Sequence, residues 1–231
     1  VTEHASQYPP MNELGQREAN ASIRGIFATP VIECAIPGAE ALNAELKQVI
    51  LDREKADTGT QHSNLGGWQS NWDLESWGGA PVRTLIDAAR AMATQVTCDR
   101  LGKPVPVTWL TNAWANVNRD GHGNEFHTHP GAYWSASYYV DDGGIGENPS
   151  LGGEFEIQDP RGVAPAMLAP HLAFSMPGGQ SVGASELVRP RAGLLMMFPS
   201  WLSHAVRPYR GDGVRISVAI NLTPAPGPQP A

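Results

Sequence analysis

The sequence contains little cysteine. Cys34 and Cys98 are the only two cysteines in 231 residues, they lie far apart, and neither belongs to a CxxC or Cys/His finger pattern. A disulfide framework or a zinc finger is therefore not expected. Isolated cysteines behave as small hydrophobic residues, so we predict that both thiols are buried.

Basic charge and long apolar runs are also scarce. The 23 Asp and Glu residues outnumber the 16 Lys and Arg residues, and no basic cluster is long enough to follow a phosphate backbone. Nucleic acid is therefore not an expected partner. No apolar run approaches the roughly 20 residues of a membrane-spanning helix, and the start VTEHASQYPP does not resemble a secretory signal. We expect a cytoplasmic protein with no membrane partner.

The length and the apolar content suit one large domain. We predict a flexible N-terminal segment over residues 1–25, a single domain over 26–223 and a Pro-rich tail over 224–231. The sequence leaves the oligomeric state open, including a homodimer.

Two helices are predicted in the first half of the chain. Between Gly38 and Asp57 the apolar residues recur at intervals of three and four, as on one face of a helix. They are Leu42, Leu46, Val49 and Ile50. A second helix is expected around Pro81, which suits a first-turn position. Its apolar face consists of Val82, Leu85, Ile86, Ala89 and Ala93.

From about Val107 onward the pattern has period two, with frequent Gly and Pro, and predicts many short strands. Three of these segments, 112–118, 133–140 and 214–221, each carry one polar face. Such faces can line a polar pocket or simply contact solvent. The chain is therefore α+β in class and mainly β.

The triplet His127-Thr128-His129 is the clearest local signal for chemistry, because residues i and i+2 of a strand project from the same face. An isolated HxH is weak evidence. His204, which follows the apolar segment 193–199, adds a third imidazole. Two histidines near one strand and a third near a later one can form a facial metal site with open positions. The ligands alone do not distinguish iron from zinc.

Arg215 and Ser217 lie on the strand that follows His204. An arginine suits the binding of a carboxylate, because its guanidinium forms two parallel hydrogen bonds and stays charged when buried. The apolar residues on the other face of this strand indicate that it is covered. An arginine on a solvated edge strand is the alternative.

The order HxH, His and then Arg-x-Ser resembles the signature of the 2-oxoglutarate/iron(II) oxygenases. The resemblance covers about residues 112–222 and is closest to bacterial and phage oxygenase-like proteins. The segments that carry it are NAWANVNRDGHGNEFHTHPGAYWSASYYVDD, GGEFEIQDPR and GLLMMFPSWLSHAVRPY, together with SNLGGWQS upstream.

This resemblance implies a double-stranded β-helix (jelly-roll, cupin-like) core with flanking N-terminal helices. It implies that His127, His129 and His204 bind Fe(II), and that Arg215 anchors 2-oxoglutarate. Ser217 and Tyr139 would add hydrogen bonds to that co-substrate. The expected reaction is hydroxylation of a small polar molecule or a peptide side chain, with release of succinate and CO2; desaturation and halogenation remain open.

The sequence departs from most of the superfamily at His129, where an Asp or Glu is usual. Three imidazoles leave the site one charge unit more positive than two imidazoles and a carboxylate, which favours dianionic 2-oxoglutarate. Glu125 or Glu154 could complete the site instead of His129. Chloride or water could also fill the position, as in halogenase-like variants.

Two other hypotheses remain. A cupin also binds metal through HxH and a later histidine, and Gly193, Pro199 and His204 fit its second motif. The cupin glutamate after HxH is absent, however, with Tyr133 and Trp134 in that region, and a cupin has no need for Arg215. The other hypothesis is a metal-binding barrel without catalysis, in which the histidines only stabilise the fold.

Overall fold

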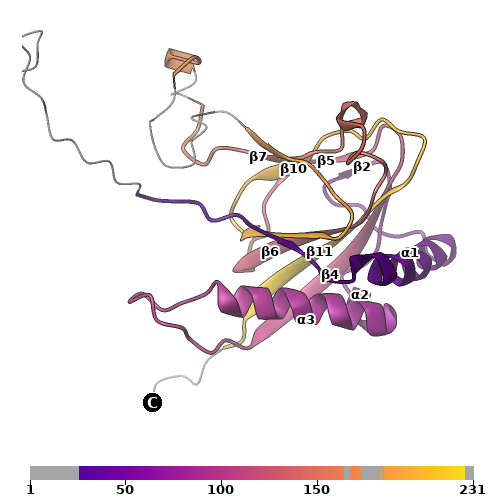
Figure 1. Cartoon of the computed structure of the whole chain (residues 1–231), viewed down its shortest axis with the longest axis horizontal. Helices are drawn as coiled ribbons and strands as arrows, with labels where there is room; N and C mark the ends of the chain where they lie inside the picture. Colours follow the sequence, from indigo (N-terminus) through magenta and orange to yellow (C-terminus); the bar gives the residue numbers. More distant parts are fainter. Residues whose placement is uncertain (1–25, 164–166, 173–182, 184, 227–231) are drawn as a thin grey trace, which may run out of the picture.

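The structure is a computed structural model that describes residues 26–163, 167–172, 183 and 185–226 (Figure 1). The predicted flexible segment 1–25 lies outside the described residues, as does the tail from residue 227 onward. Pro224, where the tail was expected to begin, is the last residue of a strand. The predicted division into domains remains a prediction.

Two antiparallel sheets form the core of the molecule. The six-stranded sheet contains, in spatial order, β1 (Ile32–Ala35), β9 (Leu194–Pro199), β6 (Trp134–Asp142), β11 (Arg215–Pro224), β4 (Trp109–Asn118) and β3 (Trp68–Gln69). The five-stranded sheet contains β2 (Asn64–Leu65), β5 (Gly123–His127), β10 (His204–Val206), β7 (Phe155–Ile157) and β8 (Glu186–Val188). The two sheets face each other as a double-stranded β-helix (Figure 1). This is the fold class that the sequence predicted.

The helices lie on the outer side of the six-stranded sheet, away from the other sheet (Figure 1). They are α1 (Ala39–Ala56), α2 (Leu74–Trp77) and α3 (Gly79–Gln95), and a short 3₁₀ turn, η1 (Pro149–Leu151), lies elsewhere. Both long helices were predicted, and residues of their apolar faces such as Ile50 and Leu85 are fully buried, whereas Leu42 and Val49 of α1 are partly buried. Burial of one such side chain contributes about 1.5–3 kcal/mol.

Strand β11 shows how alternation separates the core from the site. Ile216, Val218 and Ile220 pack in the cluster between the sheet and the helices. Arg215 and Ser217 point the other way, into the space between the two sheets. Because successive side chains of a strand project to opposite faces, one strand serves both layers.

Strand β9 divides its residues in the same way. Leu195 and Met197 join the cluster beneath the helices. Met196 and Phe198 belong to a second apolar cluster with Phe155 of β7. This second cluster closes one part of the space between the sheets, so the polar site occupies only the remainder.

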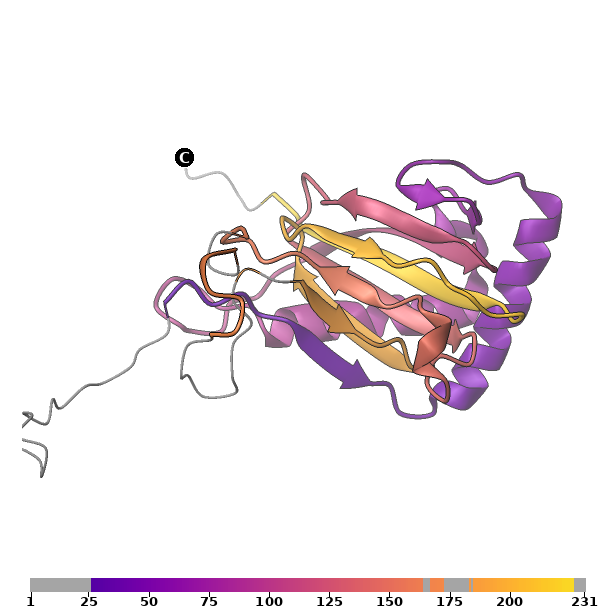
Figure 2. The same ribbon diagram turned by 90° about the horizontal axis from the view of Figure 1, so that it is seen from above.

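The structure corrects the prediction for the cysteines, since both thiols are exposed. Cys34 lies on β1, which pairs only with β9 and forms the edge of its sheet (Figure 2). Cys98 follows the end of α3. Neither position lies between packed layers, so nothing covers these side chains.

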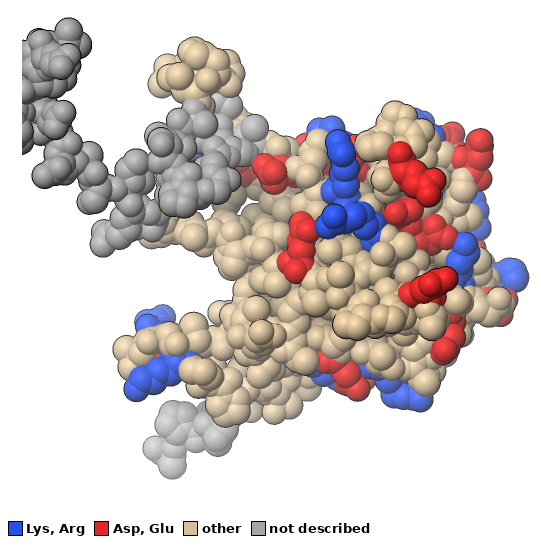
Figure 3. Space-filling view, in the orientation of Figure 1, with Lys and Arg blue, Asp and Glu red and all other residues tan. Residues whose placement is uncertain are grey.

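No helix of the described residues is long and apolar enough to cross a membrane. On the face shown in Figure 3, acidic and basic side chains are interspersed rather than separated by sign. Several form ion pairs, among them Lys47 with Asp141 and Arg119 with Glu54, both at 2.6 Å.

Candidate active site

The three predicted histidines converge between the sheets. His127 ends β5 and His204 begins β10, and the two residues are direct partners in the antiparallel register. His129 lies two residues beyond β5, where its backbone N–H donates to the carbonyl of Ser200 at 2.9 Å. The potential ligand atoms of the three rings lie within 4.8 Å of one another. One metal ion could therefore contact all three.

Backbone carbonyls orient two of these rings. The Nδ1 atom of His127 lies 2.7 Å from the carbonyl oxygen of Glu125, and Nδ1 of His204 lies 2.8 Å from that of Leu202. A carbonyl only accepts, so Nδ1 carries the proton in both rings and Nε2 presents a lone pair. Nε2 of His204 lies 3.3 Å from Nε2 of His129. Hydrogen bonds from Nδ1 to a backbone carbonyl are typical of histidines that bind a metal through Nε2.

Burial keeps these imidazoles neutral. It lowers the pKa of His204 to about 3, and the ring of His127 adds to this effect. Burial, with a further contribution from His127, lowers the pKa of His129 to about 4. The pKa of His127 is also lowered by burial, against the hydrogen bond to Glu125. At neutral pH all three lone pairs are free to bind a cation.

Aromatic rings supply much of this burial. Phe155 stacks on His204 with ring centroids 4.8 Å apart and an interplanar angle of 17°. The ring of Trp114 lies 5.5 Å from that of His129. These rings restrict the directions in which the imidazoles can turn.

Arg215 lies on the wall of the same cavity and is only 1% exposed. Among the described residues it forms no ion pair, and its Nε atom has no hydrogen-bond partner. Burial lowers its pKa, while weaker electrostatic interactions with Tyr139 and then Asp142 act in the opposite direction. A buried guanidinium without a counter-ion is costly, so the cavity suits an anion.

The other predicted co-substrate residues are close to Arg215. Ser217 is 5% exposed and lines the cavity. The ring of Tyr139 lies beneath the guanidinium, 5.3 Å from its centre, and its buried hydroxyl has no hydrogen-bond partner. Tyr139 does not line the cavity. Its ring therefore packs against the arginine, and a hydrogen bond from Tyr139 to the co-substrate remains a prediction.

Neither alternative carboxylate joins the histidines. The metal-binding cluster of the described residues contains His127, His129 and His204 without Glu125 or Glu154. Glu125 is exposed. The three-imidazole site is thus the one that the geometry supports.

The inner cavity includes Asn116 and Ser137, which the sequence analysis placed on polar strand faces, and Ser63, which it did not single out. The polar faces of 112–118 and 133–140 were the signal for Asn116 and Ser137. Ser63 comes from the segment that forms β2 and β3, and its hydroxyl lies 3.5 Å from Nε2 of His127. Ser63 reaches the cavity because segments far apart in the sequence pair in the fold, and local sequence does not reveal this pairing.

A wider cleft of about 350 Å³ adjoins the histidines. It is lined by His62, Ser63, Gln69, Trp72, Asn112, Trp114, His127, Thr128, His129, Pro130 and Asn221. Ser63, Trp114, His127 and His129 also line the inner cavity. A molecule bound in this cleft would therefore lie next to a metal held by the histidines, so we call it the substrate cleft.

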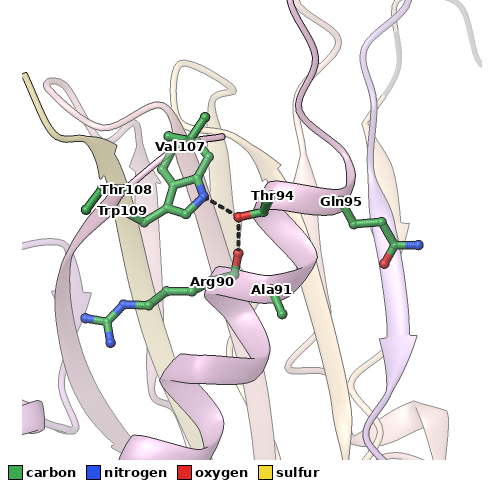
Figure 4. Close-up of a pocket in the computed structure, with 7 residues that line it drawn as sticks. All are labelled: Arg90, Ala91, Thr94, Gln95, Val107, Thr108 and Trp109. Atoms are coloured by element: carbon green, nitrogen blue, oxygen red, sulfur yellow. Dashed lines mark hydrogen bonds between the residues drawn. The ribbon is translucent and has the colours of Figure 1, made fainter. Parts of the chain in front are cut away.

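A separate depression lies between the end of α3 and the start of β4 (Figure 4). Its polar groups bind one another: Trp109 Nε1 donates to Thr94 Oγ1 at 3.0 Å, and Thr94 Oγ1 donates to the carbonyl of Arg90 at 2.9 Å. The guanidinium of Arg90 pairs with Glu75 at 3.2 Å. This depression offers no cluster of free groups for chemistry.

Comparisons with known proteins agree with this site. Residues 112–221 match the family described as "Putative 2OG-Fe(II) oxygenase". No curated protein matches the chain. Among solved structures, a prolyl 4-hydroxylase from Pseudomonas putida shares 17% identity with a TM-score of 0.59, covering 84% of this chain and 92% of its own.

Two further structures show the same fold. A prolyl hydroxylase from Trichoplax adhaerens, in complex with a peptide of hypoxia inducible factor, has 12% identity and a TM-score of 0.58, covering 84% of this chain and 83% of its own. HygX from Streptomyces hygroscopicus, with nickel and 2-oxoglutarate bound, has 12% identity and a TM-score of 0.54, covering 85% and 83%.

The matched region contains every histidine of the cluster together with Arg215. Residues 112–221, somewhat less than half of the chain, thus match this oxygenase family, and the solved structures share the double-stranded β-helix fold. The matched region indicates a non-haem, iron(II)- and 2-oxoglutarate-dependent dioxygenase.

Proposed function

We propose that His127, His129 and His204 hold the iron and that Arg215 anchors 2-oxoglutarate, so that the enzyme hydroxylates a small polar molecule or a peptide side chain. The observation that carries this proposal is the shared cavity. Three neutral imidazoles and one buried, unpaired guanidinium line the same space between the sheets. A metal and a dicarboxylate satisfy both features together.

The energetic argument rests on Arg215. Burying a charge without a partner costs several kcal/mol, and a native structure retains such a group only where something compensates it. The distal carboxylate of 2-oxoglutarate would form two charge-assisted hydrogen bonds with the guanidinium. Ser217 has a hydroxyl on the same strand face, from which it could donate a third.

Bound iron(II) and 2-oxoglutarate would supply the chemistry that activates O2, of which one oxygen atom enters succinate as CO2 is lost and the other enters the substrate. The protein binds and orients both partners and excludes water. Phe155 and Phe198 cover one side of the cavity, which lowers the local dielectric around the histidines. The neutral imidazoles leave the iron at its full positive charge, which favours the dianionic co-substrate.

The proposal names one co-substrate, 2-oxoglutarate, but only a broad class of substrate. The Trichoplax enzyme was solved with a peptide, and HygX was also solved with hygromycin B. These ligands belong to those proteins, but both classes fit the expectation of a peptide side chain or a small polar molecule. A cytoplasmic location and a homodimer remain predictions from the sequence.

The test is formation of succinate from 2-oxoglutarate by the purified chain with iron(II), ascorbate and O2. We expect turnover that depends on iron and falls by at least about 30-fold in an Arg215→Ala variant, since losing one partner of a buried charge pair costs about 2–5 kcal/mol. Arg207→Ala is the matched control, because Arg207 pairs with Glu156 at the surface.

Calorimetric titration of 2-oxoglutarate into the metal-loaded protein gives a second readout. Arg215→Lys keeps the charge but loses the paired hydrogen bonds, so it should bind more weakly than the unaltered protein and more tightly than Arg215→Ala. Circular dichroism shows whether each variant folds. If succinate formation does not exceed the metal-free background and 2-oxoglutarate does not bind, the oxygenase proposal is wrong. The cupin or the non-catalytic metal-binding barrel would then be the better interpretation.

A further inference from the structure

The substrate cleft differs from the inner cavity in its charge. Among the described residues, those that line the substrate cleft include no Asp, Glu, Lys or Arg. The inner cavity, in contrast, contains Arg215. Resting on the proposed function, we infer that the enzyme selects an uncharged substrate that presents hydrogen-bond donors and acceptors to a group of carboxamides.

The carboxamides come from three neighbouring strands. Asn112 of β4 is the direct register partner of Asn221 of β11, and Gln69 of β3 is the partner of Asn116. Gln69, Asn112 and Asn221 line the substrate cleft, while Asn116 lines the inner cavity. The strand pairing therefore places two pairs of carboxamides on the same face of the sheet, separated along β4 by Trp114.

These carboxamides can form hydrogen bonds to a ligand. Gln69 is only 2% exposed and lines the cleft, where its amide can both donate and accept. Asn221 accepts a hydrogen bond from Ser135 Oγ at 2.8 Å, which leaves its amide nitrogen to donate. Amide groups that line a cleft in this way are suited to the donors and acceptors of a ligand.

An aromatic platform lies at the rim of the cleft. The rings of His62 and Trp72 are stacked with centroids 4.7 Å apart and an interplanar angle of 23°. Trp72 is 55% exposed although it lines the cleft. A large exposed indole is available to pack against a flat or saturated ring of the ligand.

The absence of counter-charges among the described lining residues disfavours ionised ligands. A carboxylate, phosphate or ammonium group entering the cleft would lose hydration without gaining an ion pair. Carboxamides instead offer both a donor and an acceptor, as a hydroxyl or a peptide bond requires. A sugar ring and a blocked peptide share this chemistry, whereas a free amino acid or a sugar phosphate does not.

The test uses matched pairs of probes titrated calorimetrically into the metal-loaded protein with 2-oxoglutarate in the absence of O2. One arm compares methyl glycosides with the corresponding sugar phosphates. The other compares N-acetylated dipeptide amides with the unblocked dipeptides. The expected result is that at least one neutral probe binds at least about 10-fold more tightly than its charged counterpart, and the arm in which this occurs identifies the source.

Substitutions locate the binding. We expect Trp72→Ala to weaken the bound neutral probe by about 10-fold, as loss of an aromatic contact typically does. Trp201→Ala is the matched control, because Trp201 is also 55% exposed but does not line the cleft. Asn112→Asp introduces a carboxylate of the same shape and should shift preference toward an amine-bearing analogue of the same probe.

Tighter binding of the charged members would overturn the inference, as would the failure of every neutral probe to bind a protein that binds 2-oxoglutarate. Loss of succinate formation tells against the proposed function instead. Because the calorimetric arms need no turnover, the two failures are distinguishable.

Discussion

The three clustered histidines are held in the neutral form because burial removes the water that would stabilise an imidazolium. The same burial links their protonation to folding. In the unfolded chain a histidine has a pKa of about 6.5. The folded pKa values of His129 and His204 lie near 4 and 3.

The metal-free protein should therefore lose stability in mild acid. As the pH falls below about 6.5 the unfolded chain binds protons that the folded chain does not, and each such histidine contributes a slope of about 1.4 kcal/mol per pH unit. Urea unfolding between pH 8 and pH 5 measures this slope. A double variant, His129→Gln with His204→Gln, should show a smaller slope, and an unchanged slope would contradict the interpretation.

Metal affinity should be largely retained when His129 is replaced by Asp, but not when it is replaced by Ala. His129→Ala removes one of the three proposed ligands, and we expect metal affinity to fall on the order of 100-fold. His129→Asp restores an oxygen ligand and should retain most of the affinity. Competition with a chelator measures both. His122→Ala is the control, because His122 accepts from the backbone N–H of Arg119 outside the cluster.

Period-two alternation predicted which residues of a strand share a face. Arg215 and Ser217 line the cavity, as the apolar face of their strand suggested. Tyr139 shares that face, but its ring supports the guanidinium rather than lining the cavity. Alternation gives the side of a sheet, whereas the reach of a side chain depends on its neighbours.

At the scale of elements, the turn before β7 packs directly against the arginine. Gly153 has a φ of +74°, a conformation that favours glycine. A Cβ added there would lie 2.8 Å from Ile145 Cδ1 and 3.4 Å from Arg215 Cδ. The absence of a side chain at this position allows the guanidinium stem to lie where it does.

Gly153→Ala should therefore impair 2-oxoglutarate binding as well as stability. We expect a several-fold weaker dissociation constant by calorimetry and a loss of 1–3 kcal/mol in the free energy of unfolding, since both strain and overpacking act there. Gly102→Ala is the matched control: its φ is +76°, but nothing lies within 4 Å of the added Cβ. An equal loss of co-substrate affinity in both variants would contradict the steric explanation.

Long elements were predicted and very short ones were not. The two helices and the strands β4, β6 and β11 extend over enough residues to show a period. Strands β2 and β3 have two residues each, too few for any pattern. Both nevertheless contribute to the site, since β3 contains Gln69 and the residue before β2 is Ser63.

On the scale of the whole molecule, the helices and the site lie on opposite faces of one sheet. The apolar cluster contains Leu85 of α3 and the outward residues of β11, while the inward residues of β11 belong to the cavity. Stability and chemistry can therefore be altered separately, provided that the sheet keeps its register.

Leu85→Ala should destabilise the fold without changing the site. Truncation of a fully buried leucine costs about 2–5 kcal/mol. The dissociation constant of 2-oxoglutarate, measured at a temperature where the variant is folded, should stay unchanged. Leu101→Ala is the control, because Leu101 is 78% exposed and its loss should cost less than about 0.5 kcal/mol.

The sequence by itself determined the mainly β class, the helices, and the residues able to bind a metal and a carboxylate, because each follows from local periodicity or from the chemistry of a side chain. Only the tertiary structure decided which of these groups meet. The pairing of His127 with His204 depends on the register of two strands far apart in the chain, and the unpaired state of Arg215 depends on what surrounds it. Such contacts arise from the packing of the whole chain, which no local pattern encodes.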